Sequence, residues 1–248
     1  MLRFFRQFRQ RFLSENKFSK YLLYAIGEIL LVVIGILIAL QINNWNENKT
    51  KSRQLEQILS IVARDLKTDL VNSDESIAFY EELEGLLMDI ITIEYPESYF
   101  EKINAENYAE SLHSRSRISI GRSFYTQEKG IELLNSFIDN NSTVEEGLSQ
   151  EITQFYATEA RTVQKSSELV LSFAKDNFKY LEQYPWFKDY IIEKYNPETV
   201  RFFANDPSYK NKAASFLVLA VRTYLRNLKT FRESASELIE RIENRKTG

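Results

Sequence analysis

The side chains best suited to chemistry are few, and they form no catalytic pattern. His113 is the only histidine, so a histidine-based triad cannot be assembled within the chain, and there is no cysteine. None of the patterns H-E-x-x-H, G-x-x-x-x-G-K and G-x-S-x-G occurs. Acidic pairs such as Glu81-Glu82 diverge around a helix and are typical of a solvated face. We therefore expect no catalytic residue, no metal site, no cofactor and a non-enzymatic protein.

His113 stands in a basic stretch with Arg115, Arg117 and Arg122. Together they could bind an anion, but no glycine-rich phosphate cradle and no converging helix N-terminus accompanies them. A solvated basic loop is the interpretation that the sequence favours. The 14 tyrosines and 17 phenylalanines are, in the same way, more typical of a helical core than of a ligand pocket.

Glu28 is the only charged residue between Tyr21 and Ile42. A carboxylate inside a membrane is costly and commonly marks a function. Gly35 follows seven residues later on the same helical face, and Gly35-x-x-x-Ala39 is a small-xxx-small pattern that lets helices approach closely. We expect Glu28, Gly35 and Ala39 to contact a transmembrane helix of a second copy or of another protein. A solvated Glu28 without a role, and a Glu28 that transfers protons or ions, are the alternatives.

The apolar span predicts a transmembrane helix over residues 21–43. Its 22 residues from Tyr21 to Ile42 would reach about 33 Å as a helix, enough to cross a hydrocarbon core of about 30 Å. A cleaved signal peptide would have a shorter apolar stretch followed by small residues, whereas this one ends in Gln-Ile-Asn-Asn-Trp. The sequence therefore favours an uncleaved anchor in membrane lipid.

Charge is distributed unevenly around this span. Residues 1–43 hold six bases and two acids, a net charge of +4, which leaves −7 for residues 44–248 in a chain of total charge −3. The basic excess predicts a cytoplasmic N-terminus and an extracytoplasmic C-terminal domain. Residues 1–20 predict a basic amphipathic segment on anionic lipid, with recruitment of a cytoplasmic partner as the alternative. The acidic body argues against a nucleic-acid partner.

Residues 44–248 predict an extracytoplasmic all-α domain of four or five long helices, because only 7 Gly and 4 Pro interrupt the chain. Apolar residues recur at helical spacing over residues 55–70 and, more faintly, over 77–91. The first stretch would continue the transmembrane helix, with a break at 72–74 and an end at Pro96. Each helix must bury one apolar stripe, so we expect an antiparallel bundle.

The later helix boundaries have separate signals. Residues 98–112 predict a polar helix, and residues 115–122 predict a short strand or an extended loop. Thr126 is a candidate N-cap for the next helix, and residues 142–145 match a capping box that would open a long helix toward Leu181.

The last predicted helix begins after Asn205-Asp206-Pro207, where a capping residue precedes a proline at the first helical position. Its apolar positions continue to about Asn244.

Residues 18–46, FSKYLLYAIGEILLVVIGILIALQINNWN, resemble the N-terminal signature of a bacterial family of small envelope proteins of unknown function. Residues 130–134 and 151–156 look like that family's middle region, and residues 209–242 are similar to its closing helix. The resemblance implies a single-pass inner-membrane protein with a helical periplasmic domain. It supplies no catalytic residues.

Three classes of function remain open from the sequence. The leading hypothesis is an envelope protein whose helical domain binds another protein or its own copies. A sensor-like ligand-binding bundle is the second, and it is weakened by a cytoplasmic part of about 20 residues, which has no room for an output domain. An extracytoplasmic enzyme is the third, and it would need a carboxylate-lined pocket.

Overall fold

The computed structural model describes residues 17–111, 113, 115–141 and 146–245. Over these residues the chain is 82% helix and contains no strand, which confirms the all-α prediction. The chain divides into two compact units, Met1–Glu56 and Gln57–Gly248. Residues 1–16 of the predicted amphipathic segment and the capping box at 142–145 lie outside the described residues, and residues 17–20 belong to the first described helix.

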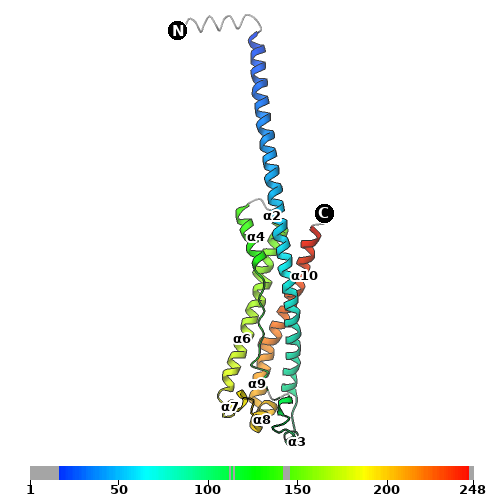
Figure 1. Cartoon of the computed structure of the whole chain (residues 1–248), viewed down its shortest axis with the longest axis vertical. Helices are drawn as coiled ribbons and strands as arrows, with labels where there is room; N and C mark the ends of the chain where they lie inside the picture. Colours follow the sequence, from blue (N-terminus) through cyan, green and yellow to red (C-terminus); the bar gives the residue numbers. More distant parts are fainter. Residues whose placement is uncertain (1–16, 112, 114, 142–145, 246–248) are drawn as a thin grey trace. The chain divides into compact units, whose positions relative to one another are not determined.

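Helix α2, Lys17–Thr92, is one continuous element of 76 residues (Figure 1). The predicted break at 72–74 is therefore wrong. The hydroxyls of Ser73 and Ser76 donate to helix carbonyls three and four residues earlier, at 2.8 and 2.9 Å. Hydroxyls that bond to their own helix in this way do not end it.

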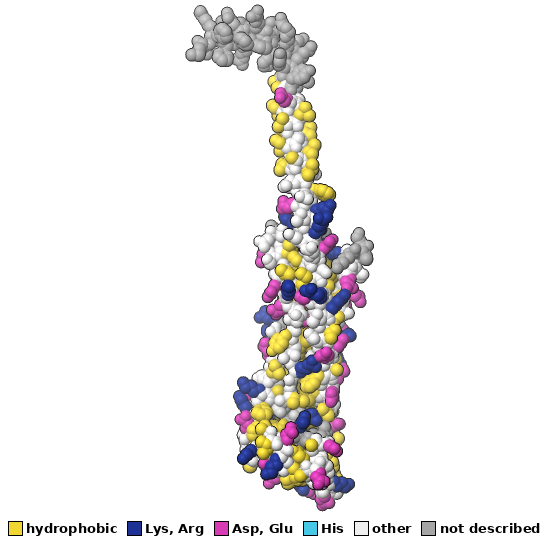
Figure 2. All heavy atoms as spheres, in the orientation of Figure 1, with side chains coloured by type: hydrophobic (Ala, Val, Ile, Leu, Met, Phe, Trp, Pro, Cys, Tyr) yellow, Lys and Arg dark blue, Asp and Glu magenta, His cyan; other side chains and the backbone are white. Residues whose placement is uncertain are grey.

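The first unit contains a long exposed apolar stretch of α2. Its large hydrophobic side chains, at Leu22 and from Ile26 to Ile42, are 42–72% exposed. An 18-residue window of the helix has a mean hydropathy of 2.6 and no buried residue. Figure 2 shows these hydrophobic side chains around the helix. By length and composition, this helix is compatible with membrane anchoring.

The second unit contains the remaining described helices: α3 (Glu97–Phe100), η1 (Tyr108–Glu110), α4 (Lys129–Asn140), α5 (Glu146–Phe155), η3 (Tyr156–Ala160), α6 (Arg161–Leu181), α7 (Phe187–Ile191), α8 (Pro197–Asn205), α9 (Pro207–Phe216), η4 (Leu217–Val221) and α10 (Arg222–Asn244). Single π-helical turns, η3 and η4, interrupt the two long runs 146–181 and 207–244. Helices were predicted over both runs, and the last one ends at Asn244 as expected.

Helix α6 packs along the continuous run of α9, η4 and α10, and together they form much of the core of the second unit (Figure 1). Their fully buried side chains include Tyr209, Phe216, Tyr224 and Phe231. Ion pairs also link α2 to α10, and their numbers rise along α2 while they fall along α10, so the two helices run in opposite directions. These pairs are Lys67–Glu243, Asp74–Arg232, Glu81–Lys229 and Glu84–Arg222.

The polar helix predicted over residues 98–112 is largely absent. Among the described residues of this range, only those of α3 and η1 are helical. Asn107 accepts the backbone N–H of Asn104 and donates to the carbonyl of Lys102, both at 2.8 Å, while Asn104 accepts the N–H of Glu106 at 2.9 Å. Asparagine side chains that bond to nearby backbone groups stabilise turns at the expense of helix.

Helices α8 and α9 begin at side-chain caps. The carboxylate of Asp206 accepts the backbone N–H groups of Ser208 and Tyr209 at 2.9 and 3.2 Å, and a proline follows it at the first helical position. This confirms the predicted start of the last helical run. Asn196 caps α8 in the same manner by accepting the N–H of Glu198 at 2.9 Å.

Candidate functional site

Residues 115–128, which we call the connecting segment, cross the second unit without forming helix or strand. Its first part confirms the predicted extended loop. Because no strand pairs with it in the described chain, its backbone groups need other partners. Helix-borne side chains supply them: Tyr190 for the N–H of Ser116, Tyr209 for the N–H of Arg117, Asn177 for the carbonyl of Ile118 and Ser167 for the N–H of Phe124.

Tyr80 of α2 bonds twice to the connecting segment. Its hydroxyl accepts the N–H of Arg122 and donates to the carbonyl of the same residue, both at 2.8 Å. The ring is fully buried and lies edge-on to Tyr224. Burial raises the pKa of Tyr80 to about 12, so the hydroxyl keeps the proton that it donates.

Two buried carboxylates of α2 accept hydrogen bonds from the end of the connecting segment and from the start of α4. Asp69 accepts the N–H of Gln127 at 3.0 Å, and Asp65 accepts the N–H of Gly130 at 2.8 Å. The contact with Gly130 satisfies an N–H group in the first turn of α4, whose own N-cap residue, Glu128, makes no side-chain cap bond. The predicted N-cap, Thr126, is therefore wrong, because the cap comes from another helix.

Asp69 is fully buried, and its environment favours the protonated form. Burial raises the pKa of this carboxyl to about 7; the hydrogen bond from Gln127 opposes the shift, and the charge of Asp65 adds to it. The hydroxyl of Tyr156 is also buried without a hydrogen-bond partner among the described residues. Burial first, and then the charges of Asp69, Asp65 and Glu128, raise the pKa of Tyr156.

A cavity of about 310 Å³ lies at the other end of the connecting segment. Its floor consists of the buried residues His113, Ser116, Thr199 and Val200. Around this floor lie half-buried side chains, and exposed residues form the rim. These walls and rim are Tyr108, Ala109, Arg115, Ile120, Tyr190, Ile191, Glu193, Lys194 and Asn196. Most of the floor is polar, which is unusual for buried surface.

His113 lies at the buried end of this cavity with 2% of its surface exposed, so the expected solvated loop is wrong for this residue. Its ring stands edge-on to Tyr95, with centroids 4.7 Å apart. Burial lowers the pKa of His113 to about 4; a hydrogen bond with the backbone of Phe203 opposes this shift, and the charge of Lys210 adds to it. The imidazole is therefore neutral near pH 7.

Some residues of the cavity floor carry buried polar atoms without a hydrogen bond, as do residues elsewhere in the described chain. No described residue hydrogen-bonds to Nε2 of His113 or to Oγ1 of Thr199, although both atoms are buried. Oγ of Ser116 also lacks a bond of good geometry, but it interacts with the hydroxyl of Tyr209. Buried polar groups in folded proteins nearly always have a partner, in the protein, in water or in a ligand.

The charged side chains of the rim are each paired with a side chain of opposite charge. Nζ of Lys194 lies 3.8 Å from the carboxylate of Asp189, and the guanidinium of Arg115 lies 3.8 Å from that of Glu193. Glu193 has a φ of 53°, the only non-glycine residue with positive φ in the described chain. Its N–H donates to the carbonyl of Tyr190 and that of Lys194 to the carbonyl of Asp189, the Schellman pattern that ends α7.

The arginines considered with His113 do not converge on one anion site. Arg115 is exposed and pairs with Glu193, whereas Arg122 pairs at 2.5 Å with Glu75 on α2. Only Arg115 of the three lines the cavity. The structure thus separates a set of residues that the sequence places together.

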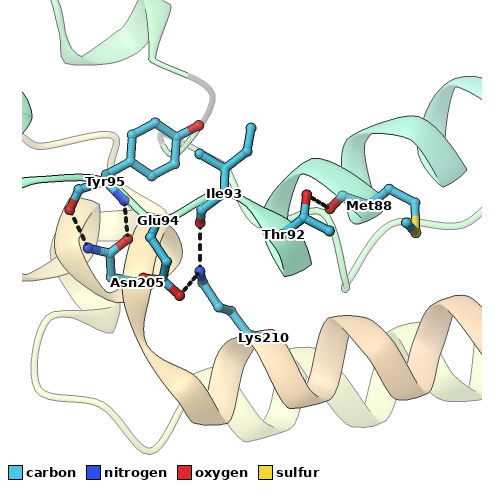
Figure 3. A network of polar contacts seen from close by, with 7 residues as sticks. All are labelled: Met88, Thr92, Ile93, Glu94, Tyr95, Asn205 and Lys210. Atoms are coloured by element: carbon cyan, nitrogen blue, oxygen red, sulfur yellow. Dashed lines mark hydrogen bonds and ion pairs between the residues drawn. The ribbon is translucent and has the colours of Figure 1, made fainter.

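The end of α2 is held by two side chains of the second unit (Figure 3). Lys210 donates to the carbonyl of Ile93 at 2.6 Å and pairs with Glu94 at 2.7 Å. Asn205 bonds to both backbone groups of Tyr95, accepting its N–H at 3.0 Å and donating to its carbonyl at 2.7 Å. A cation near a helix C-terminus also interacts favourably with the helix dipole. Helices α8 and α9 thereby fix the end of α2.

The residues predicted to form a membrane helix contact lie in the first unit. Glu28, Gly35 and Ala39 are exposed. At 100° per residue they fall within about 40° of one another around the helix. A Cβ atom on Gly35 would meet no described atom within 4 Å. Their contact with another helix stays a prediction.

The fold defines an all-helical chain with a long apolar N-terminal helix. Residues 28–121 match the model of a family of unknown function (DUF6090). The matched part includes most of α2 and the beginning of the connecting segment. No curated protein and no solved structure matches the chain. The similarity is thus to an uncharacterised family, and the N-terminal signature of residues 18–46 stays an expectation.

The sequence reading missed the side chains that bind the connecting segment. A signal for two of them was present, because Asp65 and Asp69 each follow an apolar stripe residue, Val62 and Leu66, by three positions. A carboxylate on the buried face of a helix needs hydrogen-bond donors. Tyr80 carried no such signal, since a buried tyrosine fits any aromatic core.

Proposed function

We propose that this protein is a single-pass protein of the bacterial inner membrane, with its N-terminus in the cytoplasm and a helical domain in the periplasm. The observation that carries the proposal is the exposed apolar stretch of α2, whose 18-residue window has a mean hydropathy of 2.6 and no buried residue. A continuous apolar surface of this length is stable in lipid and would promote association in water. Membrane lipid is therefore its first partner.

Side chains at the end of the apolar stretch support this placement. Nζ of Lys49 lies 4.9 Å from the ring centroid of Trp45. Lys51 pairs with Glu47 at 2.8 Å one turn further on. Tryptophan and lysine are enriched where a transmembrane helix meets the lipid headgroups.

The absence of cysteine allows a direct test of orientation. Asp139→Cys places a single thiol on the exposed face of α4, and Gln10→Cys places one before the anchor. A membrane-impermeant maleimide added to spheroplasts should label the first variant and not the second, while both should react after detergent lysis. Labelling of Gln10→Cys alone would reverse the orientation. Labelling of both in intact spheroplasts would contradict a membrane-spanning anchor.

We propose a non-enzymatic role for the domain, in which an antiparallel bundle binds an envelope protein or a second copy of the chain. The opposite directions of α2 and α10 support the bundle. Exposed apolar side chains on its surface support docking; Val71, Val218 and Leu219 are 54–60% exposed. The net charge of −7 over residues 44–248 disfavours nucleic acid.

The proposed membrane contact passes through Glu28, Gly35 and Ala39. Gly35→Leu would fill the space through which a partner helix approaches, so it should shift a self-associated particle toward the monomer. Leu37→Phe is the matched control, because residue 37 lies about 180° around the helix from residue 28. The mass of the protein particle in mild detergent, measured for both variants, tests this expectation. A strictly monomeric wild-type particle would remove the self-association version of the proposal.

A second candidate function is a ligand-binding bundle that acts as a sensor. The cavity of about 310 Å³, whose buried lining residues are mostly polar, favours it. A ligand that binds only the folded state raises the melting temperature in proportion to the logarithm of its concentration. Thermal unfolding of the full chain in lipid nanodiscs, with and without small-molecule fractions of the periplasm, tests this role; no shift with any fraction would argue against it.

A further inference from the structure

Hydrogen bonds attach helix α4 to the rest of the second unit at its start alone. The N–H of Gly130 donates to Asp65 at 2.8 Å, and the N–H of Gln127, three residues earlier, donates to Asp69 at 3.0 Å. Among the described residues, no side chain of α4 forms a hydrogen bond or an ion pair with another element; Asn140 bonds within the helix. Packing supplies the remaining attachment, through the buried side chains Ile131, Leu134 and Phe137.

The two bonds belong to one contact, which we call the α4 junction: Asp65, Asp69, Gln127 and Gly130. Asp65 and Asp69 are one turn apart and share a face of α2. The start of α4 lies directly on α2, because a Cβ atom on Gly130 would be 2.7 Å from Cα of Val62. A displacement of α4 from α2 would therefore break both bonds together, and the junction opens as one unit.

The titratable groups around Asp69 are acidic. Asp65 lies one turn away on α2, and its charge opposes the ionisation of Asp69. Tyr156 of η3 and Glu128 at the start of α4 belong to the same cluster, because the charges of Asp69, Asp65 and Glu128 all act on the Tyr156 hydroxyl. An ionised Asp69 therefore adds a buried negative charge to a group of acids.

No base offsets that charge directly in the described part of the chain. Arg64 of α2 lies 3.9 Å from Asp65, not from Asp69, and its side chain is 66% exposed. Lys129 and Glu132, in the first turn of α4, are both exposed. On the α10 side, the charged groups that flank Asp69 along α2 are already taken up in ion pairs, Lys67–Glu243 and Asp74–Arg232.

Protonation of Asp69 therefore favours the closed junction. Burial raises the pKa of this carboxyl to about 7 in the closed state, whereas a carboxyl that meets water in the open state has the ordinary value of 3.8. The closed state thus binds the proton more tightly than the open state does. The stabilisation from this proton is full below about pH 4 and is lost as the pH rises to about 7.

We propose that the α4 junction is a pH-dependent switch: a proton on Asp69 holds α4 on α2, and loss of this proton releases α4 as a unit while the rest of the second unit stays folded. Segments with few links to their surroundings commonly open in this local way. The switch needs no ligand and no partner, so it goes beyond the proposed function. Its failure would leave the labelling and self-association results unchanged.

Hydrogen exchange tests the switch in the full chain in lipid nanodiscs. Mass spectrometry compares peptides of α4 with peptides of α10 from pH 5 to pH 8.5, after correction for the intrinsic pH dependence of exchange. We expect less protection in α4 than in α10 at every pH. Protection in α4 should fall at least tenfold between pH 5 and pH 7 and less than about threefold from there to pH 8.5, since one proton changes the opening constant by at most about tenfold per pH unit.

Equal protection of α4 and α10 would overturn the proposal, because α4 would then open only when the whole domain unfolds. Protection in α4 that stays constant between pH 5 and pH 7 would overturn it as well.

Three variants assign the effect to the junction. Asp69→Asn does not titrate, so protection in α4 should vary less than about threefold with pH, whereas Asp139→Asn, at an exposed position of α4, should keep the wild-type profile. Asp65→Asn removes the neighbouring charge and should move the midpoint of the fall to lower pH, which provides a test even if Asp69→Asn were to unfold. A wild-type profile in folded Asp69→Asn, or an unmoved midpoint in Asp65→Asn, would contradict the switch.

Discussion

A Cβ atom placed on Gly130 would lie 2.7 Å from Cα of Val62, so the start of α4 touches the backbone of α2 directly. The same glycine donates its N–H to Asp65, one turn further along α2. The close approach and the hydrogen bond are thus parts of one junction. A side chain at position 130 would separate the helices and lengthen that bond.

Gly130→Ala should lower the free energy of unfolding by about 1–3 kcal/mol, because backbone atoms of Val62 cannot move aside as a flexible side chain can. Gly147→Ala is the control. Its Cβ would meet no described atom within 4 Å, and it should be neutral or stabilising by up to about 1 kcal/mol. Chemical denaturation of the full chain, followed by Trp186 fluorescence in a Trp45→Phe background, measures both. Equal effects of the two variants would contradict the junction.

The raised pKa of Asp69 predicts a pH dependence of stability. Its folded-state pKa of about 7 exceeds the ordinary 3.8, so the folded state binds the proton more tightly than the unfolded state does. The stability gained from this proton is therefore full below about pH 4 and is lost as the pH rises to about 7.

Asp69→Asn does not titrate but keeps an oxygen for the N–H of Gln127. The difference in unfolding free energy between wild type and variant should therefore change between pH 4 and pH 8, by at most about 4 kcal/mol, at about 1.4 kcal/mol per pKa unit. Denaturant titrations across this range provide the measurement. Asp139→Asn, on the exposed face of α4, should leave the wild-type profile intact. If Asp69→Asn and wild type ran parallel from pH 4 to 8, the raised pKa would be wrong.

Tyr80→Phe should destabilise the second unit by about 1–3 kcal/mol, because it leaves both backbone groups of Arg122 without the hydroxyl that serves them. The ring and its packing on Tyr224 are retained. Tyr125→Phe, at a side chain that is 59% exposed, controls for the loss of a hydroxyl. Hydrogen exchange at the amide of Arg122 should accelerate in the first variant only. Unchanged protection there would show that Tyr80 does not hold the segment.

Glu193→Gly should raise stability by about 0.5–1 kcal/mol. Residue 193 ends α7 in the left-handed region, with φ of 53°, where glycine has no steric penalty. The ion pair that it loses with Arg115 is long and exposed, so its removal costs little. Glu193→Ala separates the two effects, since it removes the charge without relieving the backbone. Thermal unfolding should rank glycine above wild type and alanine at or below it; the reverse order would contradict the strain.

The sequence determined the helical class, the apolar N-terminal helix and several helix limits. These depend on neighbours within a few positions: apolar residues three and four apart define a helix face, and Asp206 before Pro207 defines a helix start. The same local reasoning predicted a break at residues 72–74, but the helix continues there. Serine hydroxyls bond to carbonyls of the same helix, and side chains of other elements pair with this part of it.

Only the tertiary structure decided the cavity, the cap of α4 and the path of the connecting segment. Asp65 and Gly130 are 65 positions apart, and Tyr80 and Arg122 are 42 apart. Such pairs form because packing encloses backbone groups of an extended segment, and each enclosed group must then find a donor or acceptor at whatever position the fold supplies. For that physical reason the sequence alone shows His113 as a loop residue, and the fold makes it the floor of a cavity.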